Sequence, residues 1–232
     1  MQFSHSDAIW QVFPELAAGV LHAEGIHAAA DVEEAVASFS AIAEARLAEA
    51  QESEFPEIQA WRRGFSRMGL KPTQYRCASE ALLRRFRQER TLPRLHPLID
   101  LCNSISLAFA IPVAVFDAGK IAGDLQVRHA TGHETYLTFG GESEHPEQDE
   151  VIFADDEGRA HARRWTNRQS GLSAVRETTA SVLIVAEALH AGAGEDTGRL
   201  IATLADALAS RWPVTAATAT LTRASPRFEF HV

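Results

Sequence analysis

Several residue types and patterns are scarce or missing in this chain of 232 residues, and each absence argues against a class of protein. Only two cysteines occur, Cys77 and Cys102, both in apolar helix-like contexts, which argues against a disulfide framework and favours a reducing cytoplasm. The start of the chain lacks a basic-then-apolar signal pattern, and no apolar run approaches the length that spans a bilayer. We therefore expect a cytoplasmic protein with no membrane association.

The sequence also contains none of the short motifs that mark metal, phosphate or nucleophile sites. It has no G-x-S-x-G elbow, no HExxH and no paired CxxC. The stretch GAGEDTG at 192–198 is the nearest candidate for a phosphate loop, but Glu195 and Asp196 would repel phosphate. His129 and His133 stand four apart, yet a glycine between them argues against a helix that presents both to zinc. We expect no metal and no cofactor.

The order of the expected elements favours an α+β fold. Helical spacing of apolar residues dominates before Pro112, and short strands separated by Gly, Pro, Asp and Asn dominate after it. We expect a single domain over 1–232, with a strand and helix in 1–59, a core in 60–210 and a strand region in 211–232. The expected helices are 31–50, 58–68, 77–89, 96–112 and 195–210, and the expected strands are 16–26, 113–117, 125–130, 135–139, 150–155, 160–165, 181–188 and 215–222.

Positive charge is concentrated in two parts of a chain whose net charge is −9. The segment 60–96 contains ten Lys and Arg and two acidic residues, so it carries +8 and the rest of the chain carries −17. A second stretch, 159–176, holds five arginines and no acidic residue. This pattern fits either a solvated helix face or a local contact with a polyanion such as RNA, with no DNA binding expected. The candidate RNA-binding residues are Arg62, Arg63, Lys71, Arg76, Arg84 and Arg85.

Polar residues inside apolar elements are candidates for a pocket. Asp100 and Asn103 lie three apart in an apolar helical segment, so they share a helix face and could look into one pocket or tie the helix to a neighbouring loop. Glu187 ends a very apolar strand, which is typical either of a pocket acid or of a strand end that faces solvent. Both interpretations stay open for each residue.

The stretch HARRWTNRQSG at 161–171 combines three arginines with a large flat ring and several amide and hydroxyl groups. On a strand, Arg163 and Trp165 share one face and Arg164 points to the other. The ring could stack on a base, and the arginines could hold a carboxylate or phosphate. Alternatively, the tryptophan covers the edge of the core and the arginines extend outward. The candidate ligand-binding residues of this stretch are Arg163, Arg164, Trp165, Asn167, Arg168 and Ser170.

Motifs in a shared order give the chain a resemblance to a known family. The chain has IDLCN at 99–103, Pro112, FD at 116–117, FADD at 153–156 and ETT at 177–179. The family pattern is a helix carrying VDLTN, a proline, a strand ending in FD, an IAD-like strand, and ETT before the last apolar strand. On these motifs, residues 60–210 resemble the B3/B4 domain of the phenylalanyl-tRNA synthetase β subunit.

The resemblance implies a three-layer α+β fold, with helices packed on a β core, and an editing activity that hydrolyses the ester of mischarged tRNA. Such hydrolysis needs no protein nucleophile, because polar groups can position a water against an activated ester. By the resemblance, Asn103 matches the family's pocket asparagine, and Cys102 replaces the threonine before it. Ala114 stands where the family has a histidine. The family's glycine-rich loop corresponds to 162–171, and its pocket glutamate falls near 185–187.

Two functions of different classes are therefore expected. The first is a free-standing deacylase acting on mischarged tRNA or a related small conjugate, with Asn103 and Glu187 as catalytic residues. The second is a non-catalytic module that binds an amino acid, a nucleotide or an RNA end, which the alanine at Ala114 favours. A protein-interaction domain without a pocket is a third possibility. The residues expected to bind the substrate are Asp100, Cys102, Arg163, Arg164, Trp165, Asn167, Arg168 and Ser170.

Overall fold

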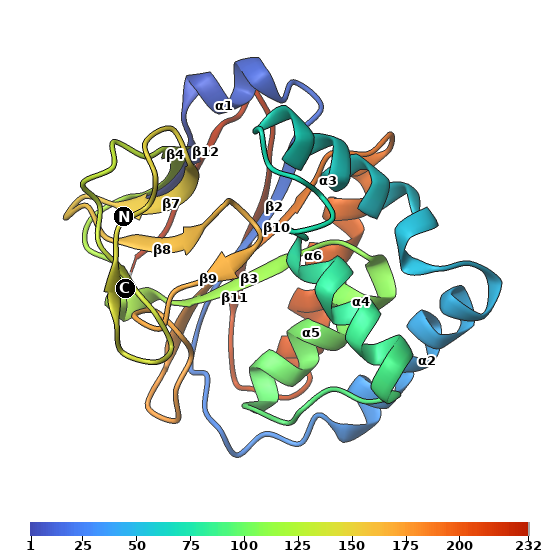
Figure 1. The fold of residues 1–232 in the computed structure, drawn as a ribbon. Helices are drawn as coiled ribbons and strands as arrows, with labels where there is room; N and C mark the ends of the chain where they lie inside the picture. Colours follow the sequence, from blue (N-terminus) through green and yellow to red (C-terminus); the bar gives the residue numbers. More distant parts are fainter. Residues whose placement is uncertain (232) are drawn as a thin grey trace.

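The computed structural model describes residues 1–231 and has the α+β architecture that the sequence predicts (Figure 1). No helix in this part of the chain is both long and apolar enough to cross a membrane. The strands are β1 Gln2–His5, β2 Ala17–Glu24, β3 Val113–Asp117, β4 Leu125–His129, β5 Tyr136–Leu137, β6 Ser143–Glu144, β7 Val151–Asp155, β8 Ala160–Arg163, β9 Arg168–Gln169, β10 Ser181–Ala188, β11 Ala216–Leu221 and β12 Arg227–Glu229. The helices are α1 Asp7–Val12, α2 Glu33–Glu49, α3 Pro56–Arg67, α4 Ala78–Glu89, α5 Pro97–Phe109 and α6 Ala193–Ala209, with short 3-10 turns η1 Glu52–Glu54 and η2 Ala118–Lys120.

The elements form three layers, with two sheets facing each other and helices covering the outer face of the second sheet (Figure 1). The first sheet has six strands in the order β12-β1-β4-β7-β8-β9, and β1 with β4 is its one parallel pair among the described residues. The second sheet has the antiparallel order β11-β2-β10-β3. Helices α5 and α6 pack on this second sheet.

The alternation of side chains along β10 divides the core into two parts. Leu183 and Val185 belong to the cluster between the sheets, whereas Val182 and Ile184 belong to the cluster between the second sheet and the helices. Because side chains on a strand alternate between its two faces, Glu187 points in the same direction as Val185, into the space between the sheets. The position of this carboxylate therefore follows from the register of one strand.

Helices α1 and α3 close one end of the space between the sheets (Figure 1). Their aromatic side chains Trp10, Trp61 and Phe65 are buried there together with Phe13, which follows α1. The amphipathic character of α3 explains this placement, since its apolar residues lie on one side of the helix. An aromatic wall thus borders the region where β8 and β10 approach each other.

Most of the elements expected from periodicity are present, within a few residues of their expected ends. The expected strand 160–165 was wrong at its end, because β8 stops at Arg163 and the next two residues turn away. The sequence did not reveal β1, α1 or β12, which are too short for periodicity to detect. β1 and β12 pair with each other in the six-stranded sheet. The assignment of the chain to one domain stays a prediction.

Candidate functional site

A small hollow of about 60 Å³ lies where the edges of the two sheets part. β3 is the edge strand of the second sheet, and β9 is the edge strand of the first. Most of the lining is apolar, and the hollow includes four residues that the sequence analysis selected together with two that it did not select as ligands. These residues are Trp165, Asn167, Arg168 and Glu187, with Ala114 and Thr166.

Glu187 is the acid of this hollow, and its carboxylate is fixed by buried partners. The side chain is 2% exposed, so the interpretation as a solvent-facing strand end was wrong. Its Oε1 atom lies 2.6 Å from His5 Nε2 and accepts a hydrogen bond of 2.8 Å from Trp165 Nε1. The Glu187 carbonyl accepts a further bond from Trp61 Nε1 at 3.2 Å. Its Oε2 atom has no hydrogen-bond partner among residues 1–231, so it stays available as an acceptor.

Trp165 is a core residue and cannot stack on a ligand in this structure, so that part of the expectation was wrong. Arg164 and Trp165 adopt left-handed backbone conformations, with φ of 47° and 58°, which turns the indole inward. The ring is 0% exposed and packs edge-on against Trp61 at 5.0 Å and Phe13 at 4.8 Å between ring centres. Two successive non-glycine residues with positive φ are unusual, and such strain is typical of functional sites. The turn serves to deliver the indole N–H to Glu187.

Thr166 and His5 are site residues that sequence reasoning missed. Thr166 lines the hollow, and its buried Oγ1 atom has no hydrogen-bond partner among residues 1–231. His5 belongs to β1, which periodicity did not detect, and it reaches Glu187 across 182 residues of sequence. The Thr166 hydroxyl is unpartnered but buried, so Glu187 Oε2 is the unpartnered polar atom that we consider for contact with a ligand or water in the hollow.

Asn103 does not reach this hollow, which corrects the expectation that it and Glu187 share one cavity. Asn103 and Asp100 do share a face of α5, but that face lines a different hollow of about 300 Å³ between α2 and the α4–α5 connection. Asp100 accepts a hydrogen bond of 3.0 Å from the Leu95 N–H and lies 3.6 Å from Arg94. The interpretation in which Asp100 ties its helix to a neighbouring loop is therefore the one the structure supports.

Cys102 is also removed from the candidate site. It is 2% exposed in the cluster between the second sheet and the helices, and burial raises the pKa of its thiol. A substrate on the surface cannot touch this side chain without unfolding of the helix layer. The expectation that Cys102 binds substrate was wrong, because its face of α5 is opposite to that of the polar residues on the same helix.

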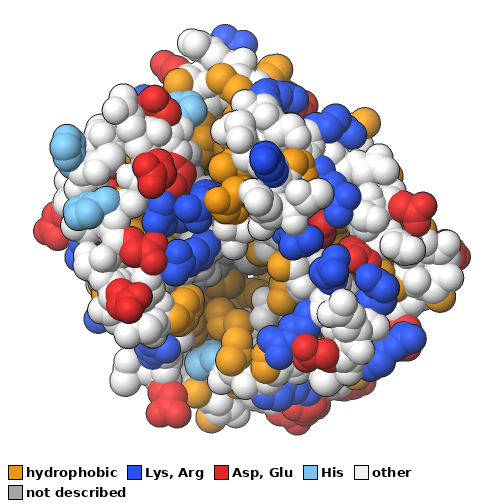
Figure 2. Space-filling view, in the orientation of Figure 1, with side chains coloured by type: hydrophobic (Ala, Val, Ile, Leu, Met, Phe, Trp, Pro, Cys, Tyr) orange, Lys and Arg blue, Asp and Glu red, His pale blue; other side chains and the backbone are white. Residues whose placement is uncertain are grey.

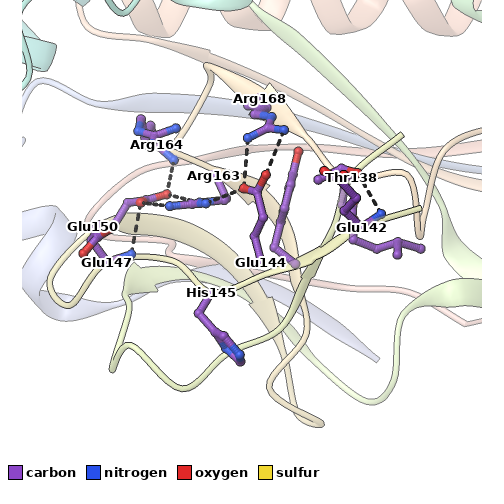
Figure 3. Close-up of polar contacts among 12 residues, drawn as sticks. Thr138, Glu142, Glu144, His145, Glu147, Glu150, Arg163, Arg164 and Arg168 are labelled. Carbon is purple, nitrogen blue, oxygen red and sulfur yellow. Dashed lines mark hydrogen bonds and ion pairs between the residues drawn. The ribbon is translucent and has the colours of Figure 1, made fainter. Parts of the chain in front are cut away.

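Two of the three arginine side chains of the 161–171 stretch, Arg163 and Arg168, are held by acidic residues of the protein (Figure 3). Arg163 donates to both carboxylate oxygens of Glu150 at 3.0 and 2.8 Å and to Glu144 at 2.7 Å. Burial by itself would raise the pKa of Glu150, but its bonds to Arg163 outweigh that effect and lower the pKa. Arg168 pairs with Glu144 at 3.0 Å. Arg163 therefore does not bind an anion here, which corrects that prediction. Arg168 is partly exposed and lines the hollow while it pairs with Glu144.

The remaining polar residues of this stretch contact other segments of the protein. Asn167 donates from Nδ2 to the Arg76 carbonyl at 2.8 Å, and Ser170, which is 0% exposed, donates to the Leu137 carbonyl at 2.9 Å. The Arg164 guanidinium lies 4.9 Å from the centre of the Tyr75 ring. Direct substrate contact by Ser170 is therefore contradicted by its burial, and the ligand roles of Asn167 and Arg164 stay predictions.

A larger hollow of about 400 Å³ adjoins the small one, since Gln169 lines both. Its walls include Ile99 and Val175 together with two strongly exposed apolar side chains, Leu95 at 69% and Phe139 at 65%. Figure 2 shows a depression with a largely hydrophobic floor in the region where Figure 1 places β3 and β9, with Lys and Arg side chains beside it over α3 and α4. We call the two hollows together the cleft; both are lined mainly by apolar groups, and Glu187 lies in the smaller, inner one.

Half of the candidate RNA-binding residues have acidic partners. Arg62 and Arg76 both approach the buried carboxylate of Glu80, and Arg85 pairs with Glu89 one helical turn away. Their charges are therefore partly neutralised within the protein. Arg63, Lys71 and Arg84 are exposed and have no ion-pair partner among residues 1–231, so their positive charge is not neutralised by an ion pair.

Ser173, His161 and Asp155 have the chemistry of a hydrolytic triad but no access to substrate. Ser173 Oγ lies 2.8 Å from His161 Nδ1, and His161 Nε2 lies 3.1 Å from Asp155 Oδ2. Ser173 and His161 are 0% exposed and line neither hollow of the cleft. Burial favours the protonated form of Asp155, yet hydrogen bonds from His161 and Arg159 outweigh it and lower its pKa. These residues tie β7 and β8 to the following loop.

Glu134 gives the fold a stability that depends on pH. Its side chain is 3% exposed; burial opposes its ionisation, but bonds from Arg128 at 2.5 Å and from the Thr131 backbone lower its pKa from 4.5 to about 2. A lowered folded-state pKa stabilises the protein above the unfolded-state pKa, and this stability is lost as the pH falls. We expect the free energy of unfolding to decrease by up to about 3 kcal/mol between about pH 5 and pH 2.

Urea denaturation at a series of pH values tests this expectation. Glu134→Gln should be less stable than the parent at neutral pH and should lose less stability on acidification. Glu49→Gln, which changes an exposed carboxylate on α2, serves as the matched control and should follow the parent curve. Parallel curves for the parent and Glu134→Gln would contradict the assignment.

Comparisons with known proteins identify related sequences. The family model of the B3/4 domain matches residues 60–211. The β subunit of the phenylalanine–tRNA ligase from Shewanella oneidensis is 31% identical over 91 residues, which is 39% of this chain and 11% of that protein. The corresponding subunit from Bartonella quintana is 29% identical over 113 residues, or 49% of this chain and 14% of that protein. This chain therefore matches only a small part of the length of these relatives.

Among solved structures, an N-terminal fragment of the phenylalanyl-tRNA synthetase β subunit from Pyrococcus horikoshii is similar with a TM-score of 0.49. The alignment covers 92% of this chain and 49% of that fragment at 12% sequence identity.

Proposed function

Because the chain belongs to the B3/4 domain family, we propose that it binds the aminoacyl end of tRNA and hydrolyses the ester of a mischarged one. The observation that carries the proposal is the free acceptor Oε2 of Glu187, a buried carboxylate that lines the small hollow and is fixed through Oε1. The resemblance to subunits of phenylalanine–tRNA ligases supports tRNA as the partner, and we propose a cytoplasmic location for the same reason.

The chemistry assigned to the hollow is attack by a water molecule on an ester. Glu187 holds the water through Oε2, while His5 and Trp165 fix Oε1 and with it the plane of the carboxylate. The water oxygen forms a bond to the ester carbon as Glu187 accepts a proton, and that proton then passes to the departing 3′ oxygen of the tRNA. The products are a free amino acid and an uncharged tRNA.

The dimensions of the cleft suit this division of roles. The inner hollow of about 60 Å³ has room for a few water molecules or a small side chain. The outer hollow of about 400 Å³ suits a nucleoside, since Phe139 offers an exposed ring for stacking and Leu95 an apolar wall. We assign the terminal nucleoside to the outer hollow and the acyl group to the inner one.

The proposal is tested by incubating the purified protein with tRNAs that carry non-cognate amino acids, among them alanine and serine. Loss of the ester at a rate above the uncatalysed rate supports the proposal. The absence of acceleration for every aminoacyl-tRNA in the panel would remove the enzymatic part of it.

The free cations of α3, α4 and the loop between them are expected to hold the tRNA backbone. Replacing each of Arg63, Lys71 and Arg84 with Gln in one variant should weaken tRNA binding. It should also reduce the slope of the logarithm of the binding constant against the logarithm of the salt concentration by about two to three, because binding then releases about one counterion fewer for each phosphate contact that is lost. A double variant of two other exposed cations, Lys120→Gln with Arg223→Gln, is the control. Binding titrations at several salt concentrations measure the effect. Equal slopes for both variants would exclude Arg63, Lys71 and Arg84 as contacts to the tRNA backbone.

A binding module without turnover is the second candidate, and Ala114 is the observation that favours it. A methyl group faces the hollow at the position where the resemblance expects a histidine, and no cysteine or histidine side chain within residues 1–231 lines the hollow. In that case the protein binds aminoacyl-tRNA, the salt dependence above is retained, and the ester is protected rather than hydrolysed.

A further inference from the structure

The edge of β3 that borders the inner hollow has free backbone groups. In an antiparallel pair, the N–H and C=O of successive residues point alternately toward and away from the partner strand. The Pro112 carbonyl accepts a hydrogen bond from the Glu187 N–H on β10, so even-numbered residues of this segment face β10. Val113, Val115 and Asp117 therefore direct their backbone groups away from β10, and Val113 lines the hollow.

Some of the outward groups along this edge already have partners, and those without partners lie side by side. The Val115 carbonyl accepts a hydrogen bond of 2.6 Å from Gln169 Nε2, and the Asp117 N–H donates to the Ser173 carbonyl at 2.9 Å. On the other side, the Ile111 carbonyl accepts from Ser106 Oγ at 2.6 Å. Among residues 1–231, the Val113 N–H, the Val113 carbonyl and the Val115 N–H have no such partner.

The free groups match the pattern with which a strand binds one residue of a parallel neighbour. In that pattern the neighbour's N–H donates to residue i, and the carbonyl of the same residue accepts from residue i+2. A longer peptide would next need the Val115 carbonyl and the Asp117 N–H, which are occupied. The free edge therefore fits a single residue and excludes a continuing strand. Val115 is 3% exposed, and its unpaired N–H is costly unless a ligand or water binds it.

We infer that the edge of β3 binds one α-aminoacyl group, whose amine donates to the Val113 carbonyl and whose acyl oxygen accepts from the Val115 N–H. This inference rests on the proposed function and specifies its substrate class, because recognition by backbone groups selects the amine and the acyl oxygen rather than the side chain. In the hydrolytic step, negative charge develops on that acyl oxygen, so the Val115 N–H also becomes a fixed donor to the oxyanion.

Nuclear magnetic resonance of the ¹⁵N-labelled protein tests the inference with three small probes. Alaninamide has both the amine and the acyl oxygen, propionamide lacks the amine, and alaninol lacks the acyl oxygen. We expect alaninamide to shift the Val113 and Val115 amide signals and to bind at least about tenfold more tightly than the other two probes. The inference is overturned if these amide signals are unchanged at about 10 mM alaninamide, or if propionamide or alaninol binds equally well.

A pair of proline variants on the same edge separates the two N–H groups. Both N–H groups point away from β10, so neither substitution removes a bond of the sheet. Val115→Pro removes the donor used here and should abolish alaninamide binding, whereas Val113→Pro keeps the carbonyl that is used and should retain it. Circular dichroism shows whether both variants are folded. If Val115→Pro is unfolded, the amide shifts of the unsubstituted protein with the three probes decide whether the inference holds.

The outcome is distinguishable from the fate of the proposed function. If mischarged tRNAs are not hydrolysed but alaninamide shifts the two amides, the aminoacyl site stands without the enzyme. If hydrolysis occurs and Val115→Pro leaves its rate unchanged in a folded protein, the enzyme stands and the role of the β3 edge is overturned.

Discussion

Replacing Glu187 with Gln is expected to lower the rate constant of deacylation by about 10²–10⁴-fold, the usual contribution of a general base. The amide preserves the size of the side chain and can still accept from the Trp165 N–H, so the geometry of the hollow is retained. What it loses is the ability to accept a proton from water. Because the change acts on the chemical step, tRNA binding should be affected much less than turnover, and single-turnover kinetics separate the two.

A buried carboxylate outside the cleft provides the control for this experiment. Glu134→Gln also removes a buried charge and costs stability, but Glu134 contacts neither hollow. Its rate constant for deacylation per folded molecule should equal that of the parent protein. If Glu187→Gln and Glu134→Gln reduce the rate constant equally, loss of folded protein explains both, and Glu187 has no catalytic role.

Replacing Trp165 with Ala is expected to reduce the free energy of unfolding by about 3–5 kcal/mol, as is usual for a buried tryptophan. The indole is fully buried between Trp61 and Phe13, so its removal leaves a cavity that the rigid aromatic wall cannot fill. The same change leaves Glu187 Oε1 with His5 as its remaining partner. Urea denaturation of the purified variant measures the loss.

Trp165→Phe divides this loss into its two parts. Phenylalanine retains most of the packing but has no N–H for Glu187, so it should cost about 0.5–1.5 kcal/mol, the usual contribution of one hydrogen bond, because His5 remains a partner of Oε1. Phe139→Ala is the control, because its ring is 65% exposed and its loss should change stability by less than about 0.5 kcal/mol. A Trp165→Ala variant as stable as the parent would contradict the description of Trp165 as a core residue.

The pattern of the sequence was sufficient for the architecture and for part of the site. Helical spacing predicted α2 to α6, and alternation predicted β3, β7 and β10, because long periodic segments follow from local propensity. The motif order predicted the family, which the match over residues 60–211 confirmed. Trp165 and Glu187 were selected as site residues, and the structure places them in hydrogen-bond contact across 22 residues of sequence.

The misplaced residues have a common physical cause. Asn103 and Cys102 are adjacent in sequence, but a helix directs them to different faces, and which face meets a cavity depends on the helices and sheet around it. Arg163 lay in a stretch without acidic residues, yet Glu144 and Glu150 come from the preceding segment and neutralise it. The number of arginines in a short stretch therefore did not predict which of them lack an acidic partner.

The sequence by itself determined the longer helices and strands and the family, because these depend on periodicity and motif spacing within segments. It selected Glu187 as a candidate but left open whether this carboxylate is buried. Tertiary structure decided which polar groups were left without partners: the Oε2 of Glu187, the hydroxyl of Thr166, the N–H and carbonyl of Val113 and the N–H of Val115. A group becomes available to a ligand only after every neighbour has taken or failed to take its hydrogen bonds, and those neighbours come from distant parts of the chain.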